Sequence, residues 1–189
     1  LRFSSEDLDY LSSLGLFREE FLAFLSSFRF TGTIHAVREG SVVFPGEPLI
    51  TVRASLIEAQ LIESLLLNIV NFQTLIATKA ARIVTASEGG KVLEFGLRRA
   101  QGFDGAMSAS RAAFVGGASA TSNTLAGRVL GIPVRGTMAH SWVMAFESEE
   151  ESFSRYAELY PESSVLLIDT YSTLDSGIEA AISVGRKLK

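Results

Sequence analysis

Val92-Leu93-Glu94-Phe95-Gly96 is a short apolar run that ends at a glycine, and a helical pattern from Asp104 to Phe114 follows it. Two later runs have the same strand character, namely Pro133-Val134-Arg135-Gly136-Thr137 and the segment from Ser164 to Asp169. A strand followed by a helix, repeated along a chain, predicts a parallel sheet with helices outside it. These stretches therefore favour the α/β class, with a sheet that is either doubly wound or closed into a barrel.

Further helical patterns accompany these runs. Thr121-Ser122-Asn123 is expected to cap a short helix that ends at Leu130, and residues 140–158 and 174–188 are each expected to form one helix. Only about three or four strand–helix units fit in the chain, whereas a closed eight-unit barrel needs roughly 200 or more residues. The sheet is therefore open, or the chain is part of a barrel.

The first third of the chain has a different pattern. Residues 1–30 have apolar side chains at helical spacing, and residues 31–53 alternate in short strands, Val42 to Phe44 among them, between turns that contain glycine and proline. Residues 57–84 form the longest helix candidate, with an apolar face wide enough to be buried on more than one side. We expect a domain boundary near Ser55.

This boundary divides the chain into two predicted parts. Residues 1–55 would be a flanking helical and β-rich subdomain, and residues 56–189 would be the first part of the α/β domain. The first residue is not methionine, and we expect the chain to be cut from something longer.

Composition and charge exclude several classes of protein. The formal net charge is -4 and the pI is about 5.3, which argues against a general nucleic-acid binder. There is no cysteine, so no disulfide and no thiolate metal site can form. No apolar run approaches the roughly 18 to 20 residues that span a bilayer. A cytosolic protein without a membrane segment is the expectation.

The residues that could take part in binding or catalysis follow successive strands of the predicted sheet. Arg98 comes after the strand 92–96, Ser122 and Asn123 after a glycine-rich segment, His140 after the strand 133–137 and Asp169 at the end of the last strand. Ligands bind at the carboxyl ends of strands in α/β folds, and this set suits a phosphorylated, polyhydroxylated ligand. Each residue alone also has a structural reading, as a surface arginine, a helix cap or a structural histidine.

Five segments together resemble nicotinate phosphoribosyltransferases, and the resemblance covers nearly the whole chain. They are Glu39-Gly40 to Pro48-Leu49, Glu94-Phe95-Gly96-Leu97-Arg98-Arg99-Ala100-Gln101-Gly102, Gly117 to Gly127, Gly136-Thr137-Met138-Ala139-His140-Ser141-Trp142 and Leu167-Ile168-Asp169-Thr170-Tyr171. The resemblance implies a type II phosphoribosyltransferase fold, in which an irregular α/β barrel is paired with a flanking β-rich α+β subdomain.

The same resemblance implies a reaction. Nicotinate and 5-phosphoribosyl 1-diphosphate would give nicotinate mononucleotide and diphosphate in NAD biosynthesis, with ATP hydrolysis coupled to the transfer. Mg²⁺ would accompany the diphosphate, and the active sites would lie at the interface of a homodimer.

Three residues take roles in the chemistry by this resemblance. His140 matches the histidine that ATP phosphorylates, and its phosphate would improve binding of the phosphoribosyl donor. Arg98 matches the arginine that contacts the phosphoribosyl substrate, and Phe95 matches an aromatic that lies against the pyridine ring in the related nicotinamide enzyme.

Four further residues are implied in substrate binding. Ser122 and Asn123 are placed where the family selects for the pyridine substituent. Nicotinamide-using relatives have an Asp at the position of Asn123, and a carboxylate there would repel nicotinate. Thr137 and Asp169 are expected beside the phosphates and the ribose.

Some family segments lie outside this sequence. These are an N-terminal segment with an aromatic for the partner subunit, and a later Asp-Ser-Gly-Asp stretch with phosphate-binding glycine loops. We therefore expect this chain to be inactive by itself. Two alternatives remain, a nicotinamide or quinolinate phosphoribosyltransferase, and a non-catalytic fragment that binds nucleotide only with a partner chain.

Overall fold

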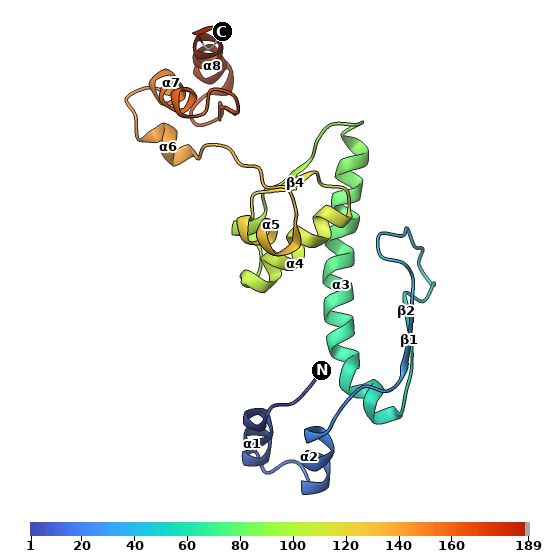
Figure 1. Cartoon of the computed structure of the whole chain (residues 1–189). Helices are drawn as coiled ribbons and strands as arrows, with labels where there is room; N and C mark the ends of the chain where they lie inside the picture. The colour runs from blue at the N-terminus through green and yellow to red at the C-terminus, as the bar shows by residue number, and fades with distance from the viewer. Residues whose placement is uncertain (188–189) are drawn as a thin grey trace. The chain divides into compact units, whose positions relative to one another are not determined.

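The computed structural model, drawn in Figure 1, describes residues 1–187 of the chain. These residues divide into two compact units, of which the first is Leu1–Ser119 and the second begins at Ala120. The boundary expected near Ser55 lies inside the first unit, and the division into a flanking subdomain and a barrel part stays a prediction.

Two short helices open the first unit, as the pattern over residues 1–30 predicts. They are α1 (Ser5–Ser13) and α2 (Glu19–Ser26). Ser4 begins α1 with a capping box, because its hydroxyl accepts a hydrogen bond from the Asp7 backbone N–H at 3.2 Å while Asp7 accepts from the Ser4 backbone. Leu25 and Phe28 are buried, so the helix α2 and the residues just after it supply the apolar core here.

An antiparallel hairpin follows, made of β1 (Thr33–Ala36) and β2 (Ile50–Arg53). The strand expected over Val42 to Phe44 is wrong, because this segment belongs to the loop of the hairpin. Its backbone bonds locally, since the Glu47 N–H donates to the Phe44 carbonyl at 3.2 Å. A backbone engaged in a tight turn is not available to a strand ladder.

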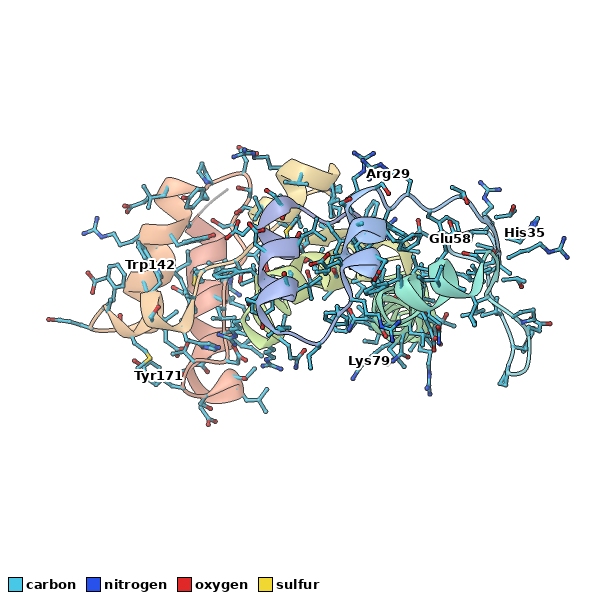
Figure 2. The ribbon with its side chains drawn as sticks, turned by 90° about the horizontal axis from the view of Figure 1, so that it is seen from below. Arg29, His35, Glu58, Lys79, Trp142 and Tyr171 are labelled. Carbon is cyan, nitrogen blue, oxygen red and sulfur yellow. The ribbon has the colours of Figure 1, made fainter. Side chains whose placement is uncertain are left out.

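The long helix α3 (Leu56–Ala86) confirms the helix predicted over 57–84. Ser55 caps it with a second capping box, in which the Ser55 hydroxyl donates to Glu58 at 2.7 Å. Glu58 is buried (Figure 2), and its carboxylate also accepts from the Thr31 N–H at 2.8 Å. These hydrogen bonds, that from the Ser55 hydroxyl most of all, lower the pKa of Glu58 to about 2.

A close helix pair completes the first unit. After β3 (Leu93–Glu94) and the 3₁₀ turn η1 (Leu97–Arg99), helix α4 (Gly102–Val115) packs on α3 and confirms the helix predicted from Asp104 to Phe114. A Cβ built on Gly116 would lie 2.5 Å from the Ala77 carbonyl oxygen of α3. The two segments approach closely at this point because glycine has no side chain.

The second unit begins with β4 (Ala120–Thr121) and helix α5 (Thr124–Leu130), and Asn123 is the N-cap, as predicted. Thr121 forms a parallel bridge with Val134. The strand expected over residues 133–137 is therefore reduced to this one bridge. The Thr121 N–H donates to the Pro133 carbonyl and the Arg135 N–H donates to the Thr121 carbonyl, each at 3.0 Å. The rest of the segment 133–137 is irregular.

Helix 140–158 is predicted as one element but is two, α6 (His140–Met144) and α7 (Glu149–Leu159). Ser148 explains the break, because its hydroxyl accepts from the Glu151 N–H at 3.1 Å and so caps a new helix. The core of this unit packs between the two helices and the chain that follows. Its buried members are Met138, Val143, Phe153, Ala157 and Val184.

The strand expected from Ser164 to Asp169 is wrong as a strand, although Leu166, Leu167 and Ile168 pack on that core. An extended segment becomes a strand only when a neighbour supplies ladder hydrogen bonds, and none of residues 1–187 does so here. The helix expected over 174–188 is a π-helical turn, η2 (Thr173–Gly177), followed by α8 (Ile178–Lys187), and residue 188 lies outside the described residues.

Helix α3 is long and apolar enough to cross a membrane by length and composition alone. Mostly buried core helices of other proteins pass the same test, whereas α3 has α4 packed on it but leaves most of its side chains exposed or half-buried among the described residues. The sequence-based expectation of no membrane segment therefore stays a prediction.

Candidate functional site

His140 is the first residue of α6, and its side chain is 46% exposed. A buried residue lies on either side of it in the sequence. Met138 and Val143 enter the core of the second unit, while the imidazole stays at the surface. The Trp142 indole N–H also donates to the Ser152 carbonyl of α7 at 3.1 Å. Packing and this hydrogen bond therefore fix the backbone that presents His140.

The two nitrogens of His140 have different polar neighbours. The Thr170 hydroxyl lies 3.2 Å from Nδ1, where the tautomer decides which of the two donates. Asp169 lies on the other side, with its Oδ1 atom 4.0 Å from Nε2, and its side chain is 60% exposed. The structure thus brings together His140 and Asp169, two of the predicted site residues. A ring oriented by a hydroxyl, beside a carboxylate, suits a nucleophile or a general base.

The segment that carries Asp169 and Thr170 is held from both ends. Ile168, just before them, lies against Gly177 of η2. A Cβ built on Gly177 would lie 1.9 Å from the Ile168 carbonyl oxygen, so only glycine permits this contact. After them, the Ser176 hydroxyl donates to the buried carboxylate of Glu149, the first residue of α7. The segment and α6 thus both pack on α7 and its core, which keeps His140 and Asp169 close to each other.

The other predicted residues of the second unit have local partners. Asn123 is only 3% exposed, and its side-chain oxygen accepts from the Ala126 N–H at 3.1 Å as the cap of α5. Ser122 is half-buried beside it. Thr137 is exposed, and its hydroxyl donates to the Met138 carbonyl at 3.1 Å. Capping is thus shown for Asn123, and a role in substrate binding stays a prediction for all three.

Phe95 and Arg98 belong to the first unit and follow β3 directly. Phe95 is 42% exposed, and Arg98 lies in η1 with its guanidinium at the surface. Among residues 1–187 the Arg98 side chain has no hydrogen bond or ion pair, which leaves its donors available to an anion. Beneath this turn lies a cavity of about 180 Å³ that Phe72 and Ile76 of α3 help to line.

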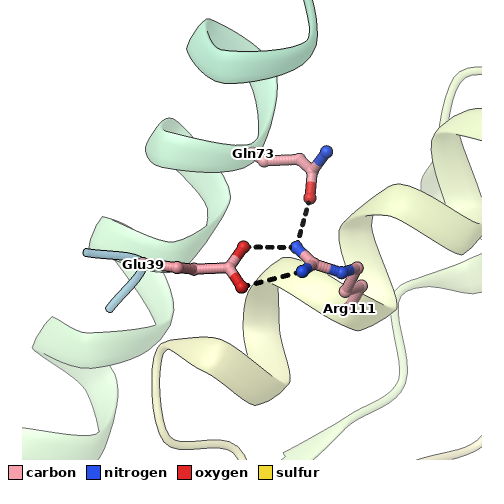
Figure 3. A network of polar contacts seen from close by, with 3 residues as sticks. All are labelled: Glu39, Gln73 and Arg111. Atoms are coloured by element: carbon pink, nitrogen blue, oxygen red, sulfur yellow. Dashed lines mark hydrogen bonds and ion pairs between the residues drawn. The ribbon is translucent and has the colours of Figure 1, made fainter. Parts of the chain in front are cut away.

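A polar network joins the hairpin loop to the helix pair of the first unit (Figure 3). The Arg111 guanidinium of α4 donates to both carboxylate oxygens of Glu39, at 2.6 and 2.8 Å, and to the Gln73 side chain of α3 at 3.0 Å. The hydrogen bond from Arg111 lowers the pKa of Glu39. The network explains why Glu39, in a segment without strand structure, has a fixed place on α4.

The described residues do not form a cation cage of their own. In residues 1–187 no three His, Cys, Asp or Glu side chains gather as a metal site. Mg²⁺ is commonly held by one or two protein carboxylates together with substrate phosphates, and Asp169 offers one exposed carboxylate. A magnesium ion would therefore fit only if its other ligands came with a phosphorylated substrate.

Sequence reasoning did not identify Thr170 or Glu149 as parts of the site. Thr170 follows Asp169 directly, so its place beside a predicted site residue could have indicated that its hydroxyl belongs to the site. Glu149 belongs to the acidic run 147–151, which reads as a solvated surface, and its burial depends on contacts that no local pattern predicts.

Known proteins match this chain over 98 to 99% of its length. The family model for the nicotinate phosphoribosyltransferase (NAPRTase) N-terminal domain matches residues 1–71. The chain is 48% identical over 187 residues to a nicotinate phosphoribosyltransferase of Mycobacterium tuberculosis (strain CDC 1551 / Oshkosh), covering 99% of this chain and 40% of that protein. It is 49% identical over 186 residues to a nicotinate phosphoribosyltransferase of Bacillus subtilis (strain 168), covering 98% and 38%.

A solved structure agrees with these relatives. The crystal structure of human nicotinic acid phosphoribosyltransferase matches with a TM-score of 0.84 at 31% identity, covering 99% of this chain and 47% of that chain. The chain thus spans about 40% of the length of the curated relatives that it matches.

Proposed function

We propose that the chain is part of a nicotinate phosphoribosyltransferase, and that the whole protein joins nicotinate to 5-phosphoribosyl 1-diphosphate, giving nicotinate mononucleotide and diphosphate in NAD biosynthesis. The observation that carries the proposal is the position of His140, with the Thr170 hydroxyl at one ring nitrogen and Asp169 beside the other.

His140 would be the group that couples ATP to this transfer. An imidazole nitrogen attacks the γ-phosphoryl group of ATP, the bond to the β-phosphate breaks and ADP leaves, so that a phosphohistidine remains. Thr170 orients the ring through Nδ1, which is the role of a positioning residue. Water later takes the phosphoryl group and returns His140 to its starting state.

The remaining predicted residues would bind the substrates. Arg98 offers forked donors for the phosphoribosyl donor, and Phe95 an exposed aromatic face for the pyridine ring. Ser122 and Asn123 would select for the pyridine substituent, while Thr137 and Asp169 would lie beside the ribose and the phosphates. Mg²⁺ would enter with the diphosphate, with Asp169 as the one protein carboxylate near His140.

The fold-level part of the proposal concerns the rest of the molecule. We place residues 56–189 in the first part of an irregular α/β barrel and residues 1–55 in a flanking subdomain. The unpaired extended segment from 164 to 169 supports this, since further strands would supply its ladder partners. A cytoplasmic homodimer with shared active sites completes the proposal.

The test is turnover of the full-length natural protein with nicotinate, 5-phosphoribosyl 1-diphosphate and ATP. Replacing His140 by alanine should abolish the ATP-coupled part of the turnover, measured as nicotinate mononucleotide formed with and without ATP. His35→Ala is the matched control, because His35 is an exposed histidine on β1. Full ATP stimulation in the His140→Ala variant would show that the central assignment is wrong.

The alternatives are separated by the same assay. Turnover with nicotinamide or quinolinate in place of nicotinate would identify a related transferase. A chain that binds nicotinate mononucleotide only with a partner fragment, and never turns over substrate, would be the non-catalytic module.

A further inference from the structure

Glu94 is the last residue of β3, immediately before the turn that carries Phe95 and Arg98. Its carboxylate has two separate partners within the first unit. One oxygen accepts from the Gly96 backbone N–H, and the other accepts from the Ser110 hydroxyl of α4 at 2.9 Å. A single side chain therefore connects the start of the turn to a helix sixteen residues later in the sequence.

The turn lies against α4, and Gly96, Leu97 and Arg99 line a cavity of about 180 Å³ together with residues of α3 and α4. Its own backbone bonds are local, because the Arg99 N–H donates to the Gly96 carbonyl at 2.9 Å. The carboxylate of Glu94 adds a hydrogen-bonded link between the start of the turn and α4.

The partners of Glu94 are suited to fixing a position. Ser110 is fully buried on α4, a helix that packs on α3, so its hydroxyl is a rigid anchor. Gly96 lies close to this carboxylate, since a Cβ built on it would be 2.9 Å from the Glu94 carboxylate oxygen. Glycine thus allows the carboxylate to lie directly against the backbone of the turn.

We propose that Glu94 is a positioning residue, whose carboxylate holds the turn from Phe95 to Arg99 on Ser110 of α4 and so presents Arg98 to the phosphoribosyl donor. The part about the donor rests on the proposed function, whereas the clamp itself does not. Glu94 does not contact substrate in this proposal. The hydrogen bonds of its carboxylate with Gly96 and Ser110 are needed, and its negative charge is not.

The first experiment measures the turn directly, by hydrogen–deuterium exchange of the full-length natural protein. Glu94→Ala should speed exchange of the amides of Gly96, Arg99 and Ala100 by about tenfold, because a hydrogen bond to a charged acceptor is lost. Ser110→Ala should speed the same amides, and it changes only one hydroxyl group if Glu94→Ala fails to fold. Unchanged exchange in both variants would overturn the clamp.

The second experiment separates position from charge. Glu94→Gln can still accept from the Gly96 N–H through its amide oxygen while its amide nitrogen meets the Ser110 hydroxyl. We expect Glu94→Ala to raise KM for 5-phosphoribosyl 1-diphosphate about tenfold with a smaller change in kcat, and Glu94→Gln to restore the wild-type value. A Gln variant with normal exchange but with the full kinetic defect would mean that the charge acts on substrate, which contradicts the proposal.

Arg111→Met is the matched control, since it removes the neighbouring tether of α4 to Glu39 and leaves the turn untouched. It should change neither the exchange of the turn nor KM. If the wild-type protein does not turn over nicotinate at all, the proposed function is wrong, and the exchange experiment still decides whether Glu94 holds the turn.

Discussion

The imidazole of His140 takes its orientation from a residue that lies thirty positions later in the sequence. A histidine at the start of a short helix would otherwise rotate freely about its side-chain bonds. Here the Thr170 hydroxyl faces one nitrogen, and the Asp169 carboxylate lies near the other. The chemistry proposed for His140 therefore depends on how firmly the segment after Ile168 is anchored.

Asn123 allows a test of substrate specificity. Asp caps helices as well as Asn does, so Asn123→Asp should keep the cap of α5, while the buried carboxylate should lower the melting temperature. If Asn123 selects for the pyridine substituent, a carboxylate there repels nicotinate, and KM for nicotinate should rise about tenfold or more. Steady-state kinetics with nicotinate and nicotinamide would check this.

The control for this prediction is Asn123→Ala. It removes the cap and should lower stability by about 1 kcal/mol, without adding a negative charge. An Asp variant that uses nicotinate as well as the wild type does would contradict the assigned role of Asn123.

At the residue scale, the sequence predicted which side chains belong to the candidate site better than it predicted their hydrogen-bond partners. His140 and Asp169 were expected at strand ends and do lie together, because each directly follows a segment that packs on the same core. Thr170 and Glu94 were not predicted. Their roles come from contacts with His140 and Ser110, thirty and sixteen residues away in the sequence, which local pattern does not contain.

At the scale of elements, helices were predicted well and strands poorly. Helix α3 was expected almost to its ends, because its hydrogen bonds are internal and Ser55 marks its start. The segments 133–137 and 164–169 have the composition of strands, but a strand needs a neighbour, which composition does not reveal. The helix over 140–158 was interrupted by the Ser148 cap, a signal that was present in the sequence.

Glu58 makes the first unit sensitive to acid. Its pKa is about 2 in the folded chain and 4.5 as the ordinary value, so the folded state favours the ionised carboxylate. A carboxyl group with a lowered pKa stabilises the fold above its ordinary pKa, and this contribution is lost as the pH falls through the folded pKa. Stability from Glu58 should therefore decrease between about pH 5 and pH 2.

The measurement is a series of melting temperatures across that range for the wild type and Glu58→Gln. The Gln side chain cannot accept from Ser55 and Thr31 together as the carboxylate does, so the variant should melt lower near pH 7. The difference should shrink toward pH 2. Glu63→Gln, an exposed position on the same helix, is the control, and a constant difference between wild type and Glu58→Gln at all pH values would contradict the assignment.

At the scale of the whole molecule, helix α3 exposes more apolar surface than a stable surface helix usually does. Leu67 is 61% exposed and Leu75 is 63% exposed. The wide apolar face was predicted to be buried on more than one side, and within the first unit it is not. Since the chain spans about 40% of its curated relatives, we expect that residues 1–189 expressed alone bind hydrophobic dyes and self-associate.

Leu67→Gln combined with Leu75→Gln tests this expectation. The double variant should reduce dye binding and self-association, measured by fluorescence and analytical ultracentrifugation. Its melting temperature should stay close to that of the parent chain, because substitutions at exposed positions usually change stability by about 0.5 kcal/mol or less. A large fall in melting temperature would mean that these leucines are core residues in solution.

Helix α4 cannot tolerate a change in its length. Ser110 and Arg111 are consecutive residues that bind two different targets, the carboxylate of Glu94 and that of Glu39. Inserting or deleting one residue before them rotates both by about 100° around the helix axis and breaks both tethers at once. Among natural relatives, alignment gaps should therefore avoid the first half of α4 and fall in the part of the hairpin loop after Glu39, and an engineered tag or fusion belongs there for the same reason.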